Sequence, residues 1–147
     1  MIALHTWCSF LSYGAFLGAF VAGTLFLIQE RQLKRKTMGV LFRRLPSLEL
    51  LDRVNFLAIG AGFGLLTVGA TSGFIEMARL RERWWNGDPK EYLTVALWVA
   101  YFAMWVLRER ALLRGRRVAL LSVAGFTLVL LTFLGAGRLV PSLHPFI

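Results

Sequence analysis

Residues 54–77 of the chain read VNFLAIGAGFGLLTVGATSGFIEM, and Glu76 is the only charged side chain among them. A helix of this length crosses the roughly 30 Å hydrocarbon core of a membrane, where each backbone polar group must bond within its own helix. Three further apolar stretches cover approximately residues 7–29, 92–107 and 118–137. The sequence therefore predicts an all-α, single-domain chain over residues 1–147 that forms a four-helix transmembrane bundle.

The composition also favours a polytopic membrane protein, because 57% of the 147 residues are hydrophobic. The net charge of +9 comes mainly from basic side chains in short loops, which favours contacts with anionic membrane lipids and argues against a nucleic-acid partner. Lys and Arg are most frequent in the loops 30–53 and 108–117. The positive-inside rule places these loops in the cytoplasm and both termini on the outer, periplasmic face of a bacterial inner membrane.

The two histidines of the chain flank the apolar stretches, with His5 before the first and His144 after the last. Four crossings place both on one face of the membrane. Neutral imidazole is a common axial ligand of non-covalent haem iron, and two imidazoles complete a six-coordinate iron. The only cysteine, Cys8, offers no competing metal site. The alternative is that each histidine caps a helix end or lies among the lipid headgroups.

The loop between the second and third apolar stretches emerges on the same face and carries Trp84 and Trp85. Paired tryptophans at this position are typical of an interfacial aromatic belt. They could equally form a lid that stacks on a porphyrin, whose propionates would pair with Arg81, Arg83 or Lys90. Both interpretations fit the sequence.

Two acidic residues near this loop have structural interpretations. Asp88 is a good helix N-cap, and Pro89 suits the first position of a helix. Glu76 lies near the outer end of its apolar stretch, where we expect an ion pair with Arg79 or Arg83 rather than a catalytic role. The chain shows no nucleophile–base pair, phosphate-binding loop or paired carboxylates, so the sequence does not predict an enzyme.

Three pairs of glycines have the G-x-x-x-G spacing that lets helix backbones approach closely. The pairs are Gly14 with Gly18, Gly60 with Gly64, and Gly69 with Gly73. We expect these glycines to form packing faces between helices of the same chain. The alternative is a face for a partner helix or a flat cofactor.

Several motifs resemble the cytochrome c assembly protein family, the CcsA/CcmC-type haem-handling group with its HemX-like relatives. The resemblance covers nearly the whole chain, and its motifs occur in the family's order. They are LH at 4–5, LIQERQLK at 27–34, LPSLELLDRVNF at 45–56, GFGLLTVG at 62–69, SG at 72–73, DPKE at 88–91, RGRR at 114–117, GF at 125–126, FLG at 133–135 and LH at 143–144.

The resemblance implies that His5 and His144 ligate a non-covalent b-type haem at the outer face, beneath the tryptophan loop. Trp85 and Asp88 match one tryptophan and the aspartate of the family's loop motif, while Gly87 replaces an expected tryptophan. The candidate haem-contacting residues are Trp84, Trp85, Asp88, Arg81 and Arg83. The implied function is to hold or relay haem in cytochrome c biogenesis, together with other assembly proteins that would share any lyase activity.

Two other functions remain open on the sequence. The chain could be an accessory subunit of a membrane complex that has lost the cofactor. It could also be an electron-transfer subunit that uses the same two histidines for a b-type haem. An absorption spectrum and redox cycling with a quinol would separate these alternatives.

Overall fold

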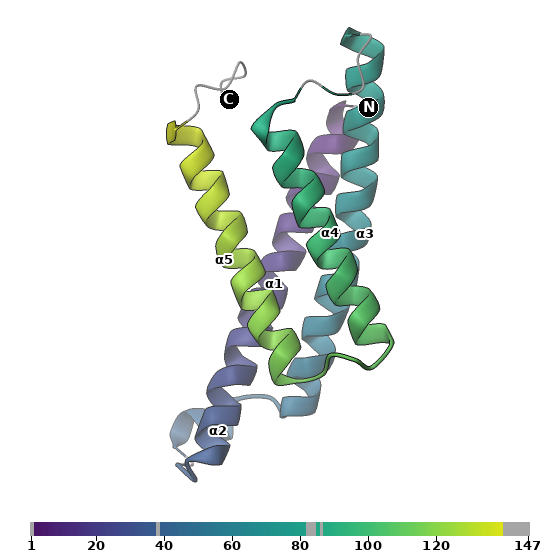
Figure 1. The fold of residues 1–147 in the computed structure, drawn as a ribbon. Coiled ribbons are helices and arrows are strands. Elements are labelled where there is room, and N and C mark those ends of the chain that lie inside the picture. The colour runs from purple at the N-terminus through teal and green to yellow at the C-terminus, as the bar shows by residue number, and fades with distance from the viewer. Residues whose placement is uncertain (1, 38, 82–84, 86, 140–147) are drawn as a thin grey trace.

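The computed structural model describes residues 2–37, 39–81, 85 and 87–139. Within these residues the chain forms only helices and connecting turns. The helices are α1 (Ile2–Lys34), α2 (Val40–Arg44), α3 (Leu48–Arg81), α4 (Pro89–Glu109) and α5 (Arg116–Leu139) (Figure 1). Each predicted apolar stretch lies inside one longer helix, and the short helix α2 was not predicted.

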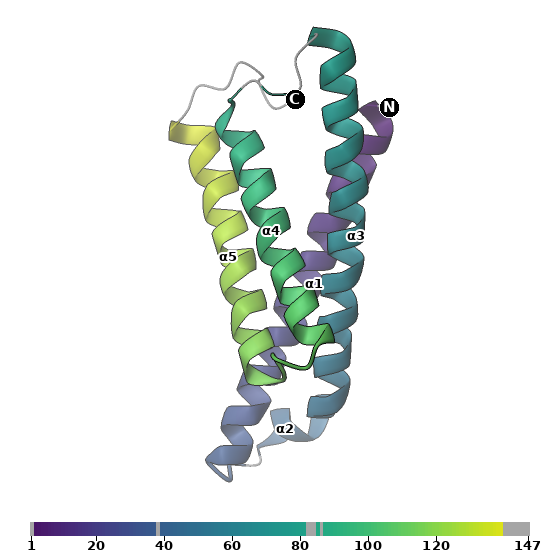
Figure 2. The same cartoon turned by 45° about the vertical axis from the view of Figure 1, so that its right-hand side comes forward.

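The four long helices alternate in direction along a bundle (Figures 1 and 2). Helix α1 packs mainly against α3 and then against α5, while α4 contacts both α3 and α5. The starts of α1 and α4 and the ends of α3 and α5 lie at one end, which we call the His5 end. Helix α2 and the turn between α4 and α5 lie at the opposite end.

Among the residues that the structure describes, three helices are long and apolar enough to cross a membrane: α1, α3 as far as Leu80, and α4. Their outward surfaces carry large apolar side chains, such as Trp7 at 69% exposure and Phe10 at 70%. Such a surface suits contact with lipid. The predicted span at 118–137 lies within α5, which is not among these three, so the fourth crossing stays a prediction.

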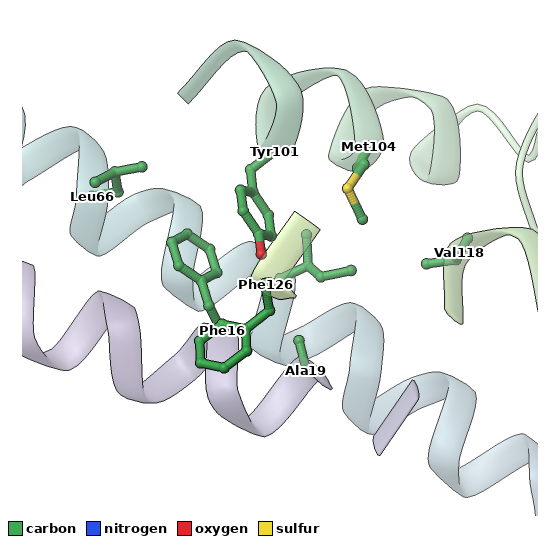
Figure 3. Packing of buried hydrophobic residues seen from close by; sticks show 8 residues of the cluster. Phe16, Ala19, Leu66, Tyr101, Met104, Val118 and Phe126 are labelled. Carbon is green, nitrogen blue, oxygen red and sulfur yellow. The ribbon is translucent and has the colours of Figure 1, made fainter. Parts of the chain in front are cut away.

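The main core lies midway along the bundle and is built around stacked aromatic rings from two helices (Figure 3). The rings of Phe16 and Tyr101 lie 3.8 Å apart between centroids, and both side chains are almost fully buried. Leu66, Met104 and Phe126 pack around them. Aromatic stacking of this kind adds to the free energy gained by burial alone.

A buried side-chain amide links three helices on the side of the Phe16–Tyr101 stack that faces the α2 end of the bundle. The Asn55 Nδ2 atom of α3 donates to the Ala19 carbonyl of α1 at 2.7 Å and to the Ser122 Oγ atom of α5 at 2.8 Å. Gly23 allows this approach, because a Cβ atom there would lie 2.7 Å from Ser122 Oγ. Between membrane helices, such hydrogen bonds and small residues replace the hydrophobic driving force available in water.

The glycine pairs behave differently from one another. Gly69 and Gly73 face α1, as predicted, and a Cβ atom at Gly69 would lie 3.2 Å from Ser9 Oγ. No described atom outside the local helix lies within 4 Å of a Cβ atom built at Gly14 or Gly18. The prediction that this first pair packs within the chain is therefore wrong.

Candidate functional site

His5 lies within the first two turns of α1 and contacts α3. Its Nδ1 atom is 2.6 Å from the carbonyl oxygen of Gly69. A carbonyl oxygen can only accept a hydrogen bond, so Nδ1 carries the proton and donates it. In the neutral ring, Nε2 is then the unprotonated nitrogen, which is the form of imidazole that binds a metal ion.

A pocket of about 330 Å³ adjoins His5 at the same end of the bundle. It is formed by the start of α1, the last third of α3 and the start of α4. Most of its wall is apolar, and its polar side chains are two carboxylates, one lysine, one threonine and His5 itself. The lining residues are Ile2, His5, Ala70, Gly73, Phe74, Glu76, Met77, Leu80, Lys90, Glu91 and Thr94.

Trp85 packs on two helices beside this pocket. Its ring stacks on Phe74 of α3, with the centroids 6.1 Å apart and the planes 14° apart. Tyr92 of α4 meets the Trp85 ring edge-on at 5.0 Å. Trp85 remains 41% exposed. Because Phe74 lines the pocket, Trp85 packs against a residue of the pocket wall.

Asp88 caps α4, as the sequence predicts. Its side chain accepts a hydrogen bond from the backbone N–H of Lys90 at 3.1 Å, and Pro89 begins the helix. The backbone N–H of Gly87, which has a φ of +72°, donates to Glu91 Oε2 at 3.2 Å. These two bonds anchor the start of α4, and with it the pocket residues Lys90 and Glu91.

The structure brings three of the predicted site residues, His5, Trp85 and Asp88, to one end of the bundle. Arg81 is the last residue of α3, and its side chain is not described. Trp84, Arg83 and His144 lie outside the described residues.

No ion pair joins Glu76 and Arg79 among the described side chains. The alternative partner, Arg83, lies outside the described residues, so the predicted ion pair of Glu76 stays a prediction. Glu76 lines the pocket. Sequence reasoning also missed Phe74 and the Gly69 carbonyl. The G-x-x-x-G spacing marked Gly69 as a packing position, but no pattern in the sequence pairs it with His5.

Residues 1–144 match the family described as Cytochrome C assembly protein. The proteins named cytochrome c biogenesis protein CcsA are similar to this chain. That of Prochlorococcus marinus (strain NATL1A) is 35% identical over 98 residues, which cover 67% of this chain and 31% of the relative. That of Gloeobacter violaceus is 34% identical over 110 residues, covering 75% and 32%. That of Crocosphaera subtropica is 29% identical over 125 residues, covering 85% and 37%.

The match therefore spans about a third of the length of these relatives, at 31% to 37%. No solved structure is significantly similar to the chain. The family match over residues 1–144 agrees with the long apolar helices and with the order of motifs along the sequence. The chain belongs to the cytochrome c assembly protein family.

Proposed function

We propose that this chain is a membrane haem-binding protein that holds non-covalent b-type haem for cytochrome c biogenesis, with His5 and His144 as the axial ligands. The observation that carries the proposal is the hydrogen bond from His5 Nδ1 to the Gly69 carbonyl. Metal-binding histidines almost always donate their other ring N–H to a carbonyl or carboxylate, which fixes the tautomer and the ring orientation. His5 has this arrangement.

The pocket beside His5 has the chemistry that a porphyrin requires. Its volume of about 330 Å³ and its apolar walls are within the range of cofactor sites. Lys90 supplies a cation for a propionate group. The carboxyl groups of Glu76 and Glu91 also line the pocket, and we propose that the propionates point away from them.

In our proposal, the loop residues contribute to haem binding at this pocket. Trp85 supports the pocket wall through Phe74, and Trp84 extends the aromatic cover. Arg81 and Arg83 provide further cations for the propionates, and Asp88 holds the start of α4 in place. When bound, haem would supply an iron, which His5 and His144 would hold. The protein residues bind it, orient it and shield it from water, and none is proposed to act as an acid, base or nucleophile.

We propose that the His5 end faces the periplasm in a bacterial inner membrane, with α5 as the fourth span. Support comes from the basic residues of α2, of the ends of α1 and α4 and of the starts of α3 and α5, which are the segments at the opposite end of the bundle (Figure 2). Cytoplasmic loops are enriched in such residues. They are Arg31, Lys34, Arg35, Lys36, Arg43, Arg44, Arg53, Arg108, Arg110, Arg114, Arg116 and Arg117. Other assembly proteins are the proposed partners, because the chain belongs to a family described as Cytochrome C assembly protein.

One observation favours a second function, that of an accessory subunit without a cofactor. The Trp85 ring already has two aromatic partners, and the Asp88 carboxylate already caps a helix. Both residues therefore have a purely structural role available. A visible spectrum separates this candidate from haem binding.

The test is the absorption spectrum of the full chain, purified in detergent and titrated with haemin. We expect a low-spin spectrum in the wild type and a high-spin spectrum, or loss of haem, in His5→Ala. Thr6→Ala is the matched control, because Thr6 is the next residue of α1 and its side chain bonds, among the described residues, only to the Ile2 carbonyl. A low-spin spectrum that persists in His5→Ala would eliminate His5 as a ligand. A wild type that takes up no haem would favour the accessory subunit.

A further inference from the structure

The His5 ring lies directly against the backbone of α3 at Gly73. A Cβ atom built at Gly73 would be 2.8 Å from both Cε1 and Nδ1 of His5. Non-bonded carbon atoms have their optimal separation at roughly 3.5–4.0 Å. Any side chain at position 73 would therefore push the ring away from α3.

This displacement would break the hydrogen bond to Gly69. The Nδ1–carbonyl distance is 2.6 Å, and moving the ring outward by the roughly 0.7–1.2 Å that a Cβ atom at Gly73 requires would lengthen it to about 3.3–3.8 Å, beyond the usual range for such a bond. Gly73 lies one helical turn after Gly69, and the ring spans the two positions. We call this arrangement, comprising the His5 ring, the Gly69 carbonyl and Gly73, the His5–α3 contact.

The described residues offer the ring no second polar partner of this kind. The Gly69 carbonyl also accepts from Ser72 Oγ at 2.9 Å, which keeps this oxygen at a defined position on the α3 surface. The orientation of the ring and its tautomer therefore depend on how closely α1 can approach α3 at this turn.

We propose that Gly73 is a positioning residue that holds His5 in its iron-binding form, because the absence of a Cβ atom lets Nδ1 reach the Gly69 carbonyl and leaves Nε2 unprotonated. The proposal rests on the proposed haem function, but the tautomer that it requires exists in the haem-free protein. It assigns to Gly73 a role beyond the close packing of two helices.

The first experiment measures the His5 tautomer in the haem-free full chain by ¹⁵N NMR at mildly alkaline pH, where imidazole is neutral. We expect a proton on Nδ1 in the wild type and on Nε2, or exchanging between the two, in Gly73→Ala. Gly64→Ala is the matched control, because Gly64 lies in the same helix and its Cβ atom would meet no described atom within 4 Å outside the local helix. A wild-type proton on Nε2, or an unchanged tautomer in folded Gly73→Ala, would overturn the proposal.

The second experiment compares haem affinity in a double-mutant cycle. We expect Gly73→Ala to weaken haemin binding by about ten-fold or more, as the loss of a partner behind a metal ligand does, and Gly64→Ala to leave it unchanged. In the His5→Ala background, Gly73→Ala should have no further effect, because it acts through His5. An equal loss in both backgrounds would overturn the positioning role. If the wild type binds no haemin, the proposed function fails, while the tautomer measurement still decides whether Gly73 positions His5.

Discussion

Replacing Trp85 by alanine tests how the loop contributes to the site. The substitution removes two aromatic contacts, with Phe74 and with Tyr92. Each such pair contributes roughly 0.5–1.5 kcal/mol beyond its buried area, so the free energy of unfolding should fall by about 1–3 kcal/mol. Thermal or denaturant unfolding in detergent, followed by circular dichroism, measures this loss.

The effect of Trp85→Ala on haem affinity should be smaller than its effect on stability. Only the contact with Phe74 touches the pocket wall. The Trp85–Phe74 contact contributes roughly 0.5–1.5 kcal/mol. If the haem-bound protein loses this stabilisation, the dissociation constant for haemin rises about two- to ten-fold. Haemin titration followed at the Soret band gives this value.

Trp7→Ala is the control for both measurements. Trp7 lies on α1, is 69% exposed and takes part in none of the aromatic contacts among the described residues. We expect its replacement to change stability by no more than about 0.5 kcal/mol. Unchanged haem affinity in a destabilised Trp85→Ala protein would refute the link through Phe74 and leave Trp85 as an interfacial residue. Unchanged stability would refute the ring contacts themselves.

The remaining predictions concern the fold. Asn55→Asp keeps the shape of the side chain but removes the donor of both buried hydrogen bonds, so the free energy of unfolding should fall by roughly 1–3 kcal/mol. Thr127→Ala, which removes an exposed hydroxyl, should change the free energy of unfolding little. Asp88→Ala should cost roughly 0.5–2 kcal/mol through loss of the α4 cap, and Asp88→Asn should restore most of it. In a Cys8→Ser background, Thr37→Cys should react with a membrane-impermeant maleimide only after the membrane is permeabilised. Labelling of Thr37→Cys from the periplasmic side of an intact membrane would contradict the proposed topology.

Local features of the fold could be predicted from the sequence. The long apolar stretches located the four main helices, because membrane spans have a length and polarity set by the bilayer. Asp88 and Pro89 located the start of α4, because capping depends on residues adjacent in the chain. The Gly69–Gly73 pair was correctly expected to pack against another helix.

The tertiary contacts could not be predicted in the same way. His5 and Gly69 are separated by 64 positions, and no pattern in either segment predicts which helix faces pack together. The same holds for Asn55 and Ser122, which are separated by 67. Gly14 and Gly18 have the same spacing as Gly69 and Gly73 but face outward, so spacing alone does not decide which glycines pack. Contacts of this kind depend on how whole helices rotate and tilt against their neighbours.

The His5–α3 contact has a consequence for the order of events during biosynthesis. Everything that forms it lies within the first 73 residues, in α1 and α3. A ribosome that adds about 5–20 residues per second needs roughly 3–13 s more to reach the end of α5. His5, the first of the two proposed ligands, can thus be oriented while the second hairpin is still being made. The nascent hairpin of α1 and α3 therefore contains every residue of the His5–α3 contact before α5 is made.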